Sequence, residues 1–187
     1  MFAGEGEKIM AAIKKKWTGS VLAAFLAFFL ILAFVPFQKN YVFVRNDTDT
    51  ITAYLPLKEA SFQIKYTHTI HRSDVLEIYK VLKDNSLVAT GLVYEDFSIG
   101  MPSDAAEGET FSERNGKYHI TNMARKMADF RLFIGDVDAD LFFLTASDEI
   151  DLKKTLERGQ SYTVRVQRLS FIQQLKGVNL NEQEIAS

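Results

Sequence analysis

Two of the three histidines in this chain lie three residues apart in the stretch FQIKYTHTIHRSD, residues 62–74. Imidazole nitrogens bind metals and exchange protons near neutral pH, and Asp74 and Glu77 supply carboxylates close by. A metal-dependent extracytoplasmic hydrolase could therefore use His68, His71 and Glu77. In an extended strand, however, successive side chains alternate between faces, so His68 and His71 point in opposite directions. The spacing alone does not assemble a metal site.

His68 instead continues an otherwise apolar stripe along residues 61–70. A buried imidazole needs a hydrogen-bond partner for each ring nitrogen. If residues 74–83 form a hairpin with this stretch around His-Arg-Ser-Asp, we expect His68 and Glu77 to lie near one another. Such a pair could bind a ligand or move a proton, and a structural ion pair explains the pattern equally well.

A second acidic pattern occurs in the stretch GDVDADLF, where Asp136, Asp138 and Asp140 alternate. Carboxylates at positions 1, 3 and 5 are typical of the start of an EF-hand loop. The match ends there, because Leu141 stands at position 6 where glycine is required and Ser147 at position 12 where a bidentate glutamate is required. The alternatives are a weak calcium site and a solvated acidic turn, of which the turn fits better.

The stretch DFSIGMPSD contains Gly100-Met101-Pro102, which predicts a chain reversal. Met101 beside Phe97 could add a small apolar contact surface. No nucleophile elbow, phosphate loop, His-Glu-x-x-His helix or dinucleotide fingerprint occurs in the chain. We therefore expect no catalytic residues and no cofactor.

The elements that position these residues follow a long apolar segment. Residues 17–37, WTGSVLAAFLAFFLILAFVPF, carry no charge, and a helix of this length crosses a hydrocarbon core of about 30 Å. Lysines 14–16 precede it and mark the cytoplasmic end. A cleaved signal peptide is the alternative, but the small residues of a cleavage site are missing. We expect a single-pass anchor in the cell membrane at 17–37, residues 1–16 in the cytoplasm, and an extracytoplasmic domain at 41–176.

That domain is predicted to be all-β, either a sandwich or a partly open barrel of about nine short strands. Asn115-Gly116 is a strong hairpin signal, because both central residues of a type I′ turn need a positive φ. One short helix is expected at residues 122–129, with Asn122 as its N-cap. Residues 177–187 lack apolar periodicity and are expected to be a disordered tail. The strands are expected at 41–46, 51–56, 61–70, 74–83, 86–97, 109–114, 117–122, 130–136, 141–145 and 161–171.

Composition narrows the classes of partner. Acidic side chains outnumber basic ones after residue 41, so nucleic acid is not an expected partner. The chain has no cysteine, which excludes a disulfide, a Cys-based zinc site and a cysteine nucleophile.

Three stretches resemble one family: FQIKYTHTIHRSDVLEIYKV, DFSIGMPS and GKYHITNMARKMADFRLFIGDV, within residues 62–166. The family is the bacterial domain-of-unknown-function family eighteen-fifty. Its most specific motif is Tyr66-Thr67-His68 followed by Val75 and Glu77, and the second is an aromatic-x-x-Gly-x-Pro turn. The chain departs from the family at Ser73-Asp74, where members have Ser-Pro, and by one glycine lost before Gly100.

The resemblance implies association with tripartite TRAP/TAXI-type solute transporters and no established activity. We expect an anchored accessory protein that binds the transporter permease, the solute-binding protein or a ligand; a passive structural or ligand-holding module of the envelope is the other non-enzymatic reading. The expected binding residues are Tyr66, Thr67, His68, Arg72, Glu77, Gly100, Met101 and Pro102. The weak metal candidates are His68, His71, Asp136, Asp138 and Asp140.

Overall fold

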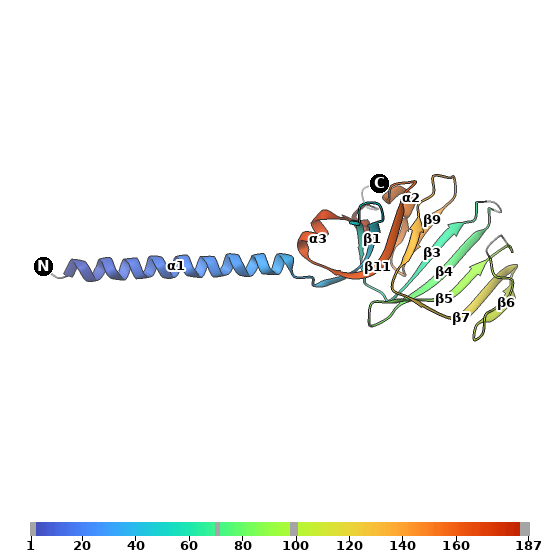
Figure 1. Ribbon diagram of the computed structural model, residues 1–187, viewed down its shortest axis with the longest axis horizontal. Helices are drawn as coiled ribbons and strands as arrows, with labels where there is room; N and C mark the ends of the chain where they lie inside the picture. Colours follow the sequence, from blue (N-terminus) through green and yellow to red (C-terminus); the bar gives the residue numbers. More distant parts are fainter. Residues whose placement is uncertain (1–2, 70–71, 98–100, 184–187) are drawn as a thin grey trace.

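A computed structural model of the chain describes residues 3–69, 72–97 and 101–183. Helix α1 (Ala3–Phe34) extends away from a domain built of β-sheets (Figure 1). Within the described part of the chain, no helix combines the length and the apolar character needed to cross a membrane. The anchor expected at residues 17–37 therefore stays a prediction.

The domain consists of two sheets, so the all-β prediction is confirmed. The first sheet has the strand order β12-β2-β1-β11-β8, and the second has the order β10-β9-β3-β4-β5-β7-β6. Neighbouring strands are antiparallel except β12 and β2. The strands are β1 (Gln38–Arg45), β2 (Thr50–Pro56), β3 (Ser61–Thr67), β4 (Asp74–Val81), β5 (Leu87–Tyr94), β6 (Thr110–Arg114), β7 (Lys117–Met127), β8 (Phe130–Phe133), β9 (Leu141–Leu144), β10 (Glu149–Asp151), β11 (Ser161–Leu169) and β12 (Val178–Asn179). Three short helices complete the described elements: α2 (Leu152–Thr155), α3 (Phe171–Lys176) and α4 (Leu180–Gln183).

Aromatic side chains join the two sheets. The rings of Phe143, Phe62, Tyr79 and Phe130 form one continuous stack, with centroids 4.9, 5.0 and 5.1 Å apart and planes within 9° of parallel. Tyr41 of β1 meets the ring of Phe62 edge-on at 5.0 Å. Stacked and edge-on pairs stabilise beyond the area that they bury, so this row fixes the spacing between the sheets.

The prediction of a helix at residues 122–129 is wrong, because residues 122–127 belong to strand β7 and residues 128–129 connect β7 to β8. Its pattern had suggested a helix because apolar residues recur three or four positions apart. In β7 that spacing comes from an irregular register: Gly91 pairs with Thr121 and Ala89 pairs with Arg125, which inserts two extra residues into β7. The insertion returns Met123 to the buried face.

Turn residues at the hairpins behave as expected. Asn115 and Gly116 both have positive φ, at 54° and 74°, and they connect β6 to β7. Asn85 has a φ of 67° between β4 and β5, where the Leu82 amide donates to the Ser86 carbonyl. These turns set the order of the second sheet along the chain.

The segment expected to be a disordered tail contains two described elements. Strand β12 pairs in parallel with β2, with Val178 opposite Ala53. Helix α4 follows, and its Leu180 is fully buried in the main core. The expectation of disorder is therefore corrected for residues 178–183, whereas residues 184–187 lie outside the described part of the chain.

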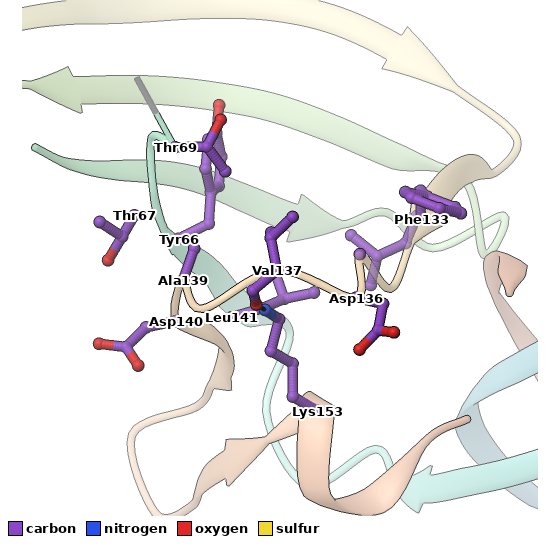
Figure 2. A pocket seen from close by; sticks show the side chains of 12 residues that line it. Tyr66, Thr67, Thr69, Phe133, Asp136, Val137, Ala139, Asp140, Leu141 and Lys153 are labelled. Atoms are coloured by element: carbon purple, nitrogen blue, oxygen red, sulfur yellow. Dashed lines mark hydrogen bonds between the residues drawn. The ribbon is translucent and has the colours of Figure 1, made fainter. Parts of the chain in front are cut away.

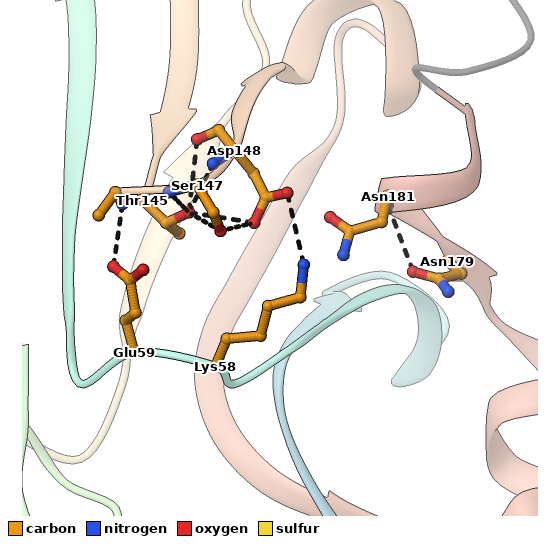
Figure 3. A network of polar contacts seen from close by, with 8 residues as sticks. Lys58, Glu59, Thr145, Ser147, Asp148, Asn179 and Asn181 are labelled. Carbon is orange, nitrogen blue, oxygen red and sulfur yellow. Dashed lines mark hydrogen bonds and ion pairs between the residues drawn. The ribbon is translucent and has the colours of Figure 1, made fainter.

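A polar network closes the end of the sandwich where β2 leads into β3 (Figure 3). Glu59 accepts a 3.0 Å hydrogen bond from the Ala146 amide in the β9–β10 turn. Lys58 lies 3.6 Å from the Asp148 carboxylate, which also accepts from Ser147 and Thr145. The hydrogen bond from Ser147 is the largest cause that lowers the pKa of Asp148. The network ties the connection between the sheets to the edge of the second sheet.

Candidate functional site

A surface groove lies between the end of β3, the β8–β9 connection and the start of α2 (Figure 2). Its volume is about 460 Å³, which is within the range of ligand sites. We call it the Tyr66 groove, after the tyrosine in its lining. The lining residues on which the argument rests are Tyr66, Thr67, Leu132, Phe133, Val137 and Leu141.

The groove is apolar, and part of its lining is open to solvent. Phe133 is 61% exposed and Val137 is 50% exposed, whereas Leu141 at the end of the connection is buried. Single exposed apolar residues are common on protein surfaces, but here they line one concavity. A concave apolar surface of this kind is typical of a site that a partner or ligand covers.

Charged side chains form the rim of the groove. Asp136 and Asp140 belong to the connection between β8 and β9, and Lys153 comes from α2 (Figure 2). The Lys153 ammonium donates to the carbonyl of Val137, which fixes the connection against α2. Arg158 lies 3.9 Å from Asp136. The groove thus has an apolar centre and a polar border, as protein-binding surfaces do.

Beside the groove, Tyr66 shares a carboxylate with a second tyrosine. Glu77 accepts a 2.5 Å hydrogen bond from the Tyr79 hydroxyl and a 3.5 Å one from the Tyr66 hydroxyl. Burial, and then the charge of Glu77, raise the pKa of both tyrosines above the ordinary value. Both hydroxyls therefore stay protonated at neutral pH, and the pair Tyr66–Glu77 offers a polar group at the edge of an apolar surface.

The expected contact between His68 and Glu77 is wrong. The two strands do form a hairpin, but their register pairs Glu77 with Ile64. The amide of His68 donates to the carbonyl of Ser73, and the amide of Arg72 donates to the carbonyl of His68. His68 comes four positions after Ile64, the residue opposite Glu77. Four residues of extended strand span roughly 13 Å. Tyr66 takes the position near Glu77 that the sequence had suggested for His68.

The other expected binding residues lie at one end of the second sheet, at the end of β3 and in two loops, or outside the described residues. Thr67 lines the groove, and its hydroxyl lies 3.3 Å from the Asp74 carboxylate. Met101 packs against the main core, and the Pro102 carbonyl accepts a hydrogen bond from the Tyr94 hydroxyl. Tyr94 pairs with Val75, so this loop and the β3–β4 loop leave the same end of the sheet. Arg72 is exposed, and Gly100 lies outside the described residues.

The metal candidates do not gather into one site in the described part of the chain. No group of three or more histidine or acidic side chains there is arranged to hold a metal ion. Asp136, Asp138 and Asp140 are exposed along the β8–β9 connection, and His71 lies outside the described residues. Because His71 is one of the trio, the hydrolase reading with His68, His71 and Glu77 stays a prediction.

Sequence reasoning missed most of the groove lining, although a signal was present. The stretch read as an incomplete calcium loop alternates acids with Val137, Ala139 and Leu141. Those three apolar residues line the groove, while Asp136 and Asp140 border it. The alternation of acidic and apolar side chains in this stretch could therefore have predicted an apolar surface with a charged rim. Lys153 had no comparable signal, because only the fold brings α2 beside the β8–β9 connection.

Comparisons with known proteins agree with the resemblance seen in the motifs. A family model described as Domain of unknown function (DUF1850) matches residues 62–152. No curated protein and no solved structure matches the chain. The matched residues run from β3 to the first residue of α2, so they contain every strand of the second sheet and, from the first sheet, β8. The lining of the Tyr66 groove lies within the match, apart from Lys153 on its rim.

Proposed function

We propose that this chain is a membrane-anchored accessory protein of a tripartite TRAP/TAXI-type solute transporter. In this proposal α1 holds the domain at the outer side of the cell membrane. The Tyr66 groove then binds the permease or the solute-binding protein. No covalent chemistry and no cofactor are part of the role.

The observation that carries the proposal is the composition of the Tyr66 groove. Phe133 and Val137 are half exposed or more, and Asp136, Asp140 and Lys153 border them. A small-molecule site usually buries most of its ligand, whereas this lining is open to solvent. An open apolar centre with a charged rim fits apolar side chains of a protein partner better than it fits an enclosed small molecule.

Support for the anchor comes from the sequence and from the exposure of α1. The segment 17–37 has no charged residue. Its described apolar side chains are exposed along the helix, with Phe25 at 59% and Leu30 at 60%. A helix with apolar side chains exposed to this extent needs an apolar environment around it.

The place of the groove relative to α1 also fits an accessory role. In Figure 1 the end of β3 that leads to the groove points away from α1. An anchored domain would therefore present the Tyr66 groove away from the membrane surface. The identity of the partner as a transporter component rests on the family resemblance, which the match of residues 62–152 supports only as far as the family itself.

Site-specific photo-crosslinking in cells that carry the transporter genes tests the proposal. The photoreactive residue p-benzoylphenylalanine replaces Phe133 in the groove, because this side chain is exposed and aromatic. Glu113 of β6 is the control, since it is exposed and lies outside both the groove and the loop that contains Gly100 to Pro102. We expect an adduct with the permease or the solute-binding protein from position 133 and none from position 113.

Two outcomes would contradict the proposal. One is the absence of any transporter component in adducts from position 133, and the other is the same adduct from both positions. A small molecule bound in the groove would give the first of these, and mass spectrometry of the purified chain would then identify the ligand.

A further inference from the structure

We propose that the domain also rests on the membrane surface through an apolar foot, formed by Phe37, Phe171 and Leu175. The foot lies beside the point at which α1 meets the domain. This inference rests on the anchor in the proposed function, but it concerns a different surface from the Tyr66 groove. Its partner is the interfacial region of a lipid bilayer.

Helix α3 supplies two of the three residues. Phe171 is 52% exposed and Leu175 is 67% exposed, and residues four positions apart lie on one face of a helix. A capping box defines the helix despite its short length: Ser170 accepts from the Gln173 amide at 3.3 Å, and the Gln173 side chain accepts from the Ser170 amide at 2.9 Å. The two apolar side chains thus project from a fixed element.

The foot is continuous with the end of α1. Helices α1 and α3 are in contact, and both lie on the same side of the domain (Figure 1). The Phe37 amide donates to the Leu169 carbonyl at 3.2 Å, and Arg168 donates to the Phe37 carbonyl at 2.6 Å. These two hydrogen bonds join the end of β11 to Phe37, three residues after the end of α1. A bilayer that encloses α1 therefore meets α3 at its surface.

Charge around the foot fits lipid headgroups. The segments 34–40 and 168–177 contain Lys39, Arg168 and Lys176 and no acidic residue, although the domain as a whole is acidic. Arg168 and Lys176 are exposed. Aromatic residues with neighbouring basic side chains are typical of segments at a membrane interface, where the apolar rings enter the acyl boundary and the cations meet phosphates. This complementarity favours a lipid surface over an apolar protein groove.

Fluorescence quenching of the full-length chain in vesicles tests the foot. The chain has no native cysteine, so a single introduced cysteine carries the environment-sensitive dye NBD. Three labelled variants are compared: Leu175→Cys in the foot, Phe25→Cys in α1, and Glu113→Cys in β6 at the far end of the domain. The vesicles contain phosphatidylcholine, phosphatidylglycerol and a nitroxide lipid whose quencher lies near the headgroups or deep in the acyl chains.

We expect the shallow quencher to reduce the fluorescence of the dye at position 175, the deep quencher to reduce it at position 25, and neither to affect position 113. Adding Phe171→Asp should remove quenching at position 175 and leave it at position 25. Quenching at position 25 without quenching at position 175 would overturn the foot and leave the anchor intact. Absence of quenching at position 25 would overturn the anchor and the foot together.

Discussion

The Tyr79 hydroxyl donates a 2.5 Å hydrogen bond to the Glu77 carboxylate, beside the tyrosine that lines the groove. Tyr79 is also the third ring of the aromatic stack between the sheets. One residue therefore connects the core packing to the position of Glu77, and through Glu77 to the Tyr66 hydroxyl. The first two predictions follow from this relationship.

Replacing Tyr79 with phenylalanine keeps the stack and removes the hydrogen bond. Hydrogen bonds to charged groups contribute roughly 1.5–3 kcal/mol, so we expect Tyr79→Phe to lower the free energy of unfolding by about that amount. Urea denaturation measures it. Tyr118→Phe is the matched control, because no hydrogen bond to its hydroxyl is found within the described residues, and it should change stability by less than about 0.5 kcal/mol. Equal effects of the two variants would contradict the assignment.

Alkaline pH should destabilise the domain through the same tyrosines. The folded-state pKa values of Tyr66 and Tyr79 are raised above the unfolded value of about 10. Their contribution is fully present below pH of about 10 and is lost as the pH rises through the folded pKa values. Absorbance at the tyrosinate band, recorded with circular dichroism, should show ionisation and unfolding together. In Tyr66→Phe the free energy of unfolding should fall less steeply with rising pH. An unchanged slope would contradict a raised pKa of Tyr66 in the folded state.

Acidic pH should also destabilise the domain, through Asp148 in the network of Figure 3. Hydrogen bonds lower the folded-state pKa of Asp148 below the ordinary value of about 3.9. The stability that it contributes is present above that value and is lost as the pH falls through the folded pKa. Asp148→Asn should therefore reduce the loss of thermal stability on acidification. Asp138→Asn, on the exposed β8–β9 connection, is the control and should retain the wild-type dependence.

The C-terminal segment should contribute substantially to stability, because Leu180 is fully buried. Truncating a buried leucine to alanine costs about 2–5 kcal/mol, and we expect Leu180→Ala to fall in this range. Val178→Ala, at a residue that is 38% exposed, should cost much less. Thermal unfolding of both variants would separate a packed segment from a loosely attached one. Equal, small effects would mean that residues 178–183 do not support the core.

Groove binding and folding should be separable at Phe133. Its side chain is 61% exposed, so Phe133→Ser should change the free energy of unfolding by less than about 0.5 kcal/mol. The same substitution should abolish binding of the purified full-length chain to the permease or solute-binding protein, measured by co-purification in detergent. A variant that binds normally would exclude the Tyr66 groove as the contact surface.

Local signals in the sequence located β1 to β9 and β11, but they missed β10 and β12. Asn115-Gly116 specifies its hairpin because both residues adopt a positive φ that few others tolerate. Residues 122–129 were wrongly predicted to be helical, because the irregular register of β7 produces the same apolar spacing as a helix. The order in the C-terminal segment could not be predicted from the sequence. Two residues in β12 and the buried Leu180 are too few to give a periodic apolar pattern.

The candidate site was only partly accessible from the sequence. Tyr66, Thr67 and Glu77 were expected to matter, but their arrangement depends on the register of one hairpin. Register in a hairpin depends on the apolar pattern of the strands and on the geometry of the turn, and here it pairs Glu77 with Ile64. The groove itself joins β3, the β8–β9 connection and α2, which are far apart in the chain. Only tertiary packing brings them together.

The two sheets differ in when their strands become available during synthesis. The second sheet lies within one continuous stretch, whereas β1 is the strand next to α1 and pairs with β11, which begins more than a hundred residues later. At about 5–20 residues per second, a ribosome has long released β1 before β11 emerges. Strand β1 can therefore pair early with β2, but the first sheet stays incomplete until β11 has emerged.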